Sequence, residues 1–95
     1  MTEKEVSWVF APAQAEKAYR CPCCKYKTLH ARGGDEICPV CFWQDDGQDE
    51  ADAELVLGGP NSNLSLRQAQ MNFKKDGVVE MRFLSHVRKA LPDEL

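Results

Sequence analysis

Two short stretches, Cys21-Pro22-Cys23-Cys24 and Cys38-Pro39-Val40-Cys41, decide how the rest of this chain is interpreted. Taken as two Cys-x-x-Cys pairs, Cys21 with Cys24 and Cys38 with Cys41, they have the ligand type and the spacing of a structural zinc site. A proline after the first cysteine of each pair helps to fix the turn, and the 13 residues between the pairs leave room for the two turns to meet. The sequence therefore predicts one tetrahedral site with four thiolate ligands.

The fifth cysteine and the identity of the metal leave alternatives open. Since the second pair has two intervening residues, symmetry of the two turns favours Cys24 over Cys23 as the fourth ligand. Cys23 is then either a small packing residue or a free thiol with a redox or metal-exchange role. Iron in a rubredoxin-like site uses the same four sulfurs, so the spacing alone allows both metals. We favour zinc, because nothing else in the sequence indicates electron transfer.

Length and hydropathy indicate one domain in a reducing compartment. A chain of 95 residues buries a smaller fraction of its surface than a larger domain does, so a metal site would help to stabilise it. No apolar run has the form of a signal peptide, and none approaches the about 20 residues of a transmembrane helix. We therefore expect a cytoplasmic protein with reduced thiols and no membrane partner.

The charge pattern argues weakly against nucleic acid as a partner. The formal net charge is −3, from 12 basic and 15 acidic residues, so the chain lacks the positive excess of a protein that binds phosphates. One stretch is acidic without any basic residue, and it begins with Asp45, Asp46, Asp49 and Glu50. A solvated loop is the default interpretation. The alternative is a docking surface for a protein with a basic surface, with Trp43 as an exposed aromatic contact.

Local signals predict a small α+β fold. β-Favouring residues over 26–30 and the turn signal Gly33-Gly34 predict a zinc-ribbon-like hairpin at residues 20–43. Ser65 with Gln68 has the form of a capping box and Gly77 that of a C-cap, which together predict a helix over 66–76. Apolar spacing favours a second helix over about 80–90, ended by Pro92. The hairpin is thus expected to precede an acidic loop and two C-terminal helices.

The order of these motifs resembles the bacterial cysteine-rich CPCC family. The resemblance rests on Cys-Pro-Cys-Cys at 21–24, Ile-Cys-Pro-Val-Cys-Phe-Trp at 37–43, Asp-Asp-Gly at 45–47, Gly-Gly-Pro-Asn at 58–61 and His-Val-Arg at 86–88. Lys25 stands where the family usually has glycine. The family is described as zinc-binding, without an established biochemical activity. The resemblance thus implies a domain over 19–95 in which Cys21, Cys24, Cys38 and Cys41 bind zinc, and it does not imply an enzyme. Residues 1–18 would be an N-terminal extension with a short strand over 6–10 and a helix after Pro12.

Three functions are compatible with this sequence. The favoured one is a non-enzymatic, zinc-stabilised protein-interaction module, in one version an inhibitor or immunity-type protein that covers a basic site such as that of a nuclease. The second is a nucleic-acid-binding zinc ribbon that uses Arg20, Lys25, Lys27 and Arg32. The third is redox or zinc handling through Cys23.

Overall fold

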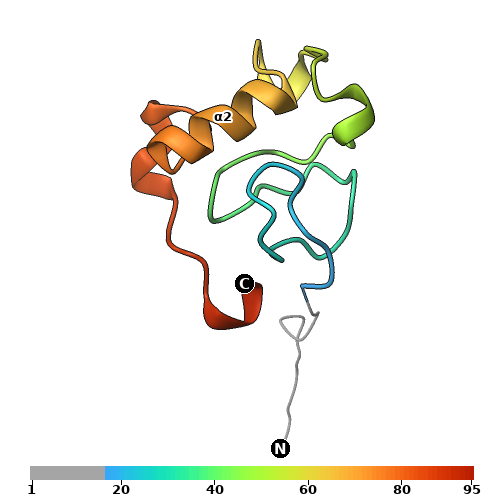
Figure 1. Cartoon of the computed structure of the whole chain (residues 1–95). Coiled ribbons are helices and arrows are strands. Elements are labelled where there is room, and N and C mark those ends of the chain that lie inside the picture. The colour runs from blue at the N-terminus through green and yellow to red at the C-terminus, as the bar shows by residue number, and fades with distance from the viewer. Residues whose placement is uncertain (1–16) are drawn as a thin grey trace, which may run out of the picture.

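One α-helix and several short turns make up the regular structure of the residues that the structure describes. The computed structural model describes residues 17–95, and within them the only α-helix is α2 (Leu66–Asp76). The 3-10 helices of this part are η2 (Glu50–Asp52), η3 (Gly59–Asn61), η4 (Met81–His86) and η5 (Pro92–Glu94). The loops that carry the cysteines pack beneath α2, and the C-terminal segment runs back along them (Figure 1).

The helix predicted over 66–76 is confirmed with Ser65 and Gly77 as its caps, but the Gln68 side chain bonds to Asn72 and does not complete the predicted capping box. The Ser65 hydroxyl accepts a hydrogen bond from the Gln68 amide at 3.0 Å, which satisfies one of the first free amides. Gly77 ends the helix with a φ of 79°, a left-handed conformation that glycine adopts without steric cost. Leu66 and Ala69 are fully buried and join the apolar cluster that contains the cysteines. α2 therefore covers the cysteine loops with one narrow apolar stripe.

The predicted zinc-ribbon hairpin at residues 20–43, and with it the α+β fold, is wrong. Residues 17–95 contain no β-strand, only two isolated antiparallel bridges, Tyr19 with Leu29 and Ile37 with Gln44. The first bridge closes the first cysteine loop, residues 19–29, and the second bridge closes the second cysteine loop, residues 37–44. The predicted hairpin would instead have paired the first loop with the second. Leu29 exchanges both backbone hydrogen bonds with Tyr19, while the Cys38 amide and the Glu36 carbonyl bond to Trp43 and Asp45, so these groups are not free to pair 26–30 with 36–38. The residues on either side of each cysteine turn therefore pair with each other and not with the other turn.

The second helix predicted over about 80–90 is also wrong. The six-residue η4 takes its place, and the chain has no helical structure from Val87 to Leu91, before η5. A backbone contact with the second cysteine loop explains the change: the Arg88 amide donates to Pro39 O at 3.1 Å. Just before the predicted range, the Val79 amide donates to Cys41 O at 3.0 Å and joins the segment to the same loop. Amides bound to another loop cannot take part in a helical ladder.

The core is built around the cysteines. All five cysteines belong to the buried cluster, which also includes Leu29, Val40, Trp43 and Ala53. No helix among the described residues has the length and apolar character needed to cross a membrane. The strand predicted over 6–10, and most of the helix predicted after Pro12, fall outside the described residues.

Candidate metal centre

Each cysteine pair lies in a tight turn of the same kind. The Lys25 amide donates to Cys21 O at 2.8 Å, and the Phe42 amide donates to Cys38 O at 2.9 Å. Both closing residues have left-handed backbone, with φ of 70° at Lys25 and 74° at Phe42. Glycine adopts this conformation most easily, which explains why glycine suits the position that Lys25 occupies. The turn forms here with lysine in its place.

The two turns bring four sulfurs together. The Sγ atoms of Cys21, Cys24, Cys38 and Cys41 all lie within 4.8 Å of one another. Cys21 Sγ is 3.6 Å from Cys41 Sγ, and Cys24 Sγ is 3.7 Å from Cys38 Sγ. A tetrahedral ion with metal–sulfur bonds of about 2.3 Å separates its sulfurs by roughly 3.8 Å. The spacing of the four sulfurs therefore fits one metal ion, and the cluster includes Cys24 and not Cys23.

Hydrogen-bond donors surround the second cysteine pair. The Val40 amide donates to Cys38 Sγ and the Trp43 amide to Cys41 Sγ, each at 3.4 Å, while the Thr28 hydroxyl lies 3.0 Å from Cys38 Sγ. Donors of this kind orient a ligand and stabilise negative charge on sulfur. Thr28 is buried and was not predicted from the sequence, because threonine is an ordinary residue in a β-favouring run.

Burial and crowding set the proton affinities of the thiols. Burial raises the pKa of Cys41, and hydrogen bonding with Cys21 raises the pKa of Cys24. Hydrogen bonds from the neighbouring thiols, that of Cys21 first, lower the pKa of Cys38. A metal ion must displace protons from such a cluster, so its affinity is expected to fall as the pH decreases.

Two residues predicted for the partner surface lie in the interior. Trp43 and Asp45 are fully buried, so the expectation of an exposed aromatic at Trp43 is wrong. Trp43 packs in the apolar cluster around the cysteines. The Asp45 carboxylate accepts hydrogen bonds from Arg32 Nε at 2.9 Å and from the Gly33 amide at 2.7 Å. Asp46 is half-buried.

The exposed members of the predicted surface are paired within the chain. The side chains of Asp49 and Glu50 are 56% and 52% exposed. Arg32 donates to Asp49 at 2.9 Å and lowers its pKa. Hydrogen bonding by Gln70, followed by that of Lys25, lowers the pKa of Glu50 to about 2. The acidic stretch is thus partly neutralised by basic residues from its flanks.

Three of the four basic residues considered for nucleic acid have partners for their side chains within the chain, and Lys27 is the fourth. Arg20 donates to Lys25 O at 2.7 Å, the Lys25 ammonium lies 3.0 Å from Glu50, and Arg32 binds Asp45. Cys23, the thiol considered for redox chemistry, is only 5% exposed.

The fold and the site define a small cysteine-cluster domain that can hold one metal ion. The sequence profile described as Cysteine-rich CPCC matches residues 19–94, so the chain belongs to the cysteine-rich CPCC family. The resemblance seen in the order of the motifs is confirmed. No curated protein and no solved structure matches the chain.

Proposed function

We propose that Cys21, Cys24, Cys38 and Cys41 bind one Zn²⁺ ion as a structural site, and that the domain acts in protein interaction rather than catalysis. The spacing of the four buried sulfurs carries the proposal. Four protein ligands complete a tetrahedron, whereas a catalytic zinc site keeps one position for water or substrate. Zinc is favoured over iron, because no other feature of the sequence points to electron transfer.

A structural metal ion would provide a direct link between the two cysteine loops. The two cysteine loops sit on separate bridges, and no sheet joins them within residues 17–95. An ion bound to one pair from each loop would link them directly. In domains of this kind the free energy of metal binding is part of the free energy of folding.

Metal content tests the site. Protein purified without chelator should contain one zinc per chain by elemental analysis, and Co²⁺ substitution should give the visible absorption of a tetrahedral tetrathiolate complex. Expression in medium with equal zinc and iron separates the two metals. A red, iron-loaded protein would contradict zinc, and a metal-free, folded protein would contradict the structural site altogether.

The acidic loop is the surface we propose for a basic protein partner. Its exposed carboxylates include Asp49, Glu50 and Glu54, the last with a side chain 73% exposed. Arg67 pairs with Glu50 at 2.9 Å and with Glu54 at 3.0 Å, and Arg32 pairs with Asp49. Exposed ion pairs contribute only about 0–1 kcal/mol each, so arginines of a partner can replace Arg32 and Arg67 at these carboxylates at little cost. An inhibitor that covers a basic site is one form of this proposal.

Site-specific photo-crosslinking in cells tests the surface. A photoreactive residue at position 49 should capture a protein with a basic surface, and high salt before irradiation should reduce the capture. The same residue at position 71, an exposed methionine on α2, provides the control. Identical adducts from both positions would contradict the proposal.

The two other functions gain no support from the site. The internal hydrogen bonds of Arg20, Lys25 and Arg32 favour neither DNA nor RNA as a partner. The burial of Cys23 favours packing over exchange chemistry.

A further inference from the structure

A cavity of about 650 Å³ lies between the end of α2, the C-terminal segment and the cysteine loops. Its volume is within the about 300–1,000 Å³ typical of small-molecule sites. None of the residues that line it is a cysteine or belongs to the acidic stretch. The cavity therefore contains none of the four clustered cysteines and lies apart from the proposed partner surface.

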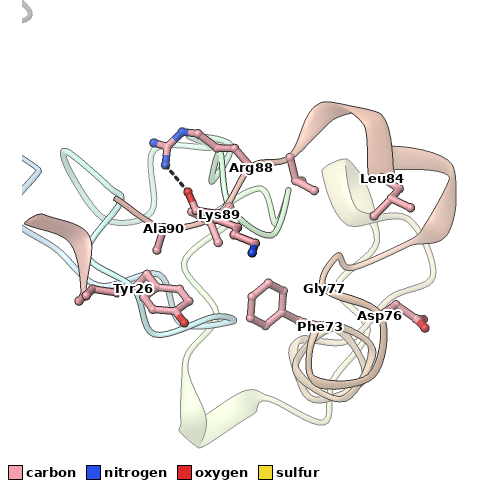
Figure 2. Close-up of a pocket in the computed structure, with 11 residues that line it drawn as sticks. Tyr26, Phe73, Asp76, Gly77, Leu84, Arg88, Lys89 and Ala90 are labelled. Atoms are coloured by element: carbon pink, nitrogen blue, oxygen red, sulfur yellow. Dashed lines mark hydrogen bonds between the residues drawn. The ribbon is translucent and has the colours of Figure 1, made fainter. Parts of the chain in front are cut away.

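Two aromatic rings form one side of this cavity. Tyr26 and Phe73 meet edge to face, with ring centroids 6.5 Å apart and an interplanar angle of 80°. Both rings border the same open space in Figure 2. Val40, 3% exposed, and Leu84, 46% exposed, add aliphatic surface. Such a wall suits a flat apolar body, because a third ring can pack against the two present.

The charge that faces the cavity is positive. Figure 2 shows the Lys89 ammonium directed toward the Phe73 ring, while the Asp76 carboxylate points away. Arg88, the neighbouring cation, is occupied by the buried Glu94 carboxylate at 2.8 and 2.9 Å. Within residues 17–95, no carboxylate lies within 4.0 Å of the Lys89 ammonium.

We propose that this cavity binds a small organic anion that joins a flat apolar body to one carboxylate. The body packs against Tyr26, Phe73 and Leu84, and the carboxylate binds the Lys89 ammonium. Lys89 is a cation beside an apolar wall, and the second lining cation, Arg88, is already bound to Glu94. This favours an apolar molecule with one carboxylate, since a neutral molecule gains no ion pair and a cationic one is repelled.

One wall of the cavity is the tip of the second cysteine loop. The amide of Val40 donates to Cys38 Sγ at 3.4 Å, and the amide of Arg88 holds Pro39 O at 3.1 Å. The cavity is therefore tested on the full chain in its metal-loaded form.

The probe pair 1-naphthoate and 1-naphthamide tests the proposal, because the two molecules share one shape and differ in charge. In amide NMR titrations we expect saturable binding of one naphthoate per chain, with the largest shifts at Val40, Lys89 and Ala90. Lys89→Gln should weaken naphthoate about three-fold, the effect of one exposed ion pair, and leave naphthamide unchanged. Lys75→Gln, at an exposed lysine of α2 that does not line the cavity, should change neither.

A second variant tests the apolar wall. Leu84→Asn changes an exposed side chain, so it should preserve the fold while weakening both naphthoate and naphthamide. Three results would overturn the proposal: no saturable shifts at the cavity amides, equal affinity of naphthoate for wild type and Lys89→Gln, or shifts at the same amides that grow with protein concentration alone. The last result would assign the surface to a second copy of the chain.

Discussion

The buried carboxylate of Glu94 should be one of the largest single contributors to stability outside the metal centre. It is fully buried and accepts hydrogen bonds from Arg88 at 2.8 and 2.9 Å, from Lys17 at 2.9 Å and from the Leu91 amide at 2.8 Å. The Arg88 guanidinium, more than any other neighbour, lowers the pKa of Glu94 from 4.5 to about 2. At about 1.4 kcal/mol for each tenfold change in proton affinity, this corresponds to roughly 3 kcal/mol.

Solvent reduces that figure, because the Arg88 side chain is 40% exposed and its field is partly screened. We therefore expect Glu94→Gln to lower the free energy of unfolding by about 2 kcal/mol at pH 7. Urea unfolding of the metal-loaded wild type and variant measures this difference in the free energy of unfolding. Asp93→Asn is the matched control, since Asp93 also pairs with Lys17, at 3.4 Å, but is 70% exposed, and it should cost less than about 0.5 kcal/mol.

The pH dependence gives the sharper test. Because the pKa of Glu94 is lower in the folded state, its contribution is fully present above the unfolded value of 4.5 and is lost as the pH falls toward about 2. The stability difference between wild type and Glu94→Gln should hold steady from pH 7 to about 5 and shrink below. The difference cancels the loss of metal affinity that both proteins share in acid. Equal effects of the Glu94 and Asp93 variants, or a difference that does not change with pH, would refute the reasoning.

Three further predictions concern the cysteines and the acidic stretch. Cys38→Ser should lose stoichiometric metal by elemental analysis and several kcal/mol of stability, because metal binding contributes to folding; full metal retention would contradict the four-cysteine site. Cys23→Ser should keep one metal per chain and lose about 1–2 kcal/mol, since a hydroxyl replaces a buried thiol; metal loss would make Cys23 a ligand. Asp45→Ala should cost about 3 kcal/mol in urea unfolding, because it leaves Arg32 without its buried partner, whereas Glu54→Ala should cost below about 1 kcal/mol. Similar losses from the two acidic variants would contradict the difference in burial.

The helix and the sulfur cluster could be predicted because their signals are local. The cap residues Ser65 and Gly77 mark the two ends of α2. The spacing of two residues between the cysteines of each pair is typical of the turn that each pair forms. The hairpin could not be predicted correctly, because β-favouring residues over 26–30 are equally compatible with a single bridge to Tyr19. The prediction of a second helix was wrong because of tertiary contacts. The amides of Val79 and Arg88 bind the second cysteine loop, and the apolar periodicity of 80–90 does not reveal these bonds.

The ion pairs of the acidic stretch could not be predicted from its composition. Its charges looked solvated because no basic residue lies within the stretch, yet Arg32, from between the cysteine pairs, binds Asp45 through Nε and Asp49 through Nη1. This arrangement also limits what a basic partner can do. A partner that takes Asp49 competes for an exposed carboxylate, while Arg32 keeps its bond to the buried Asp45 and to Gln48 O. A basic partner at the acidic loop would therefore exchange the outer ion pairs and leave the buried contact of Arg32 with Asp45 in place.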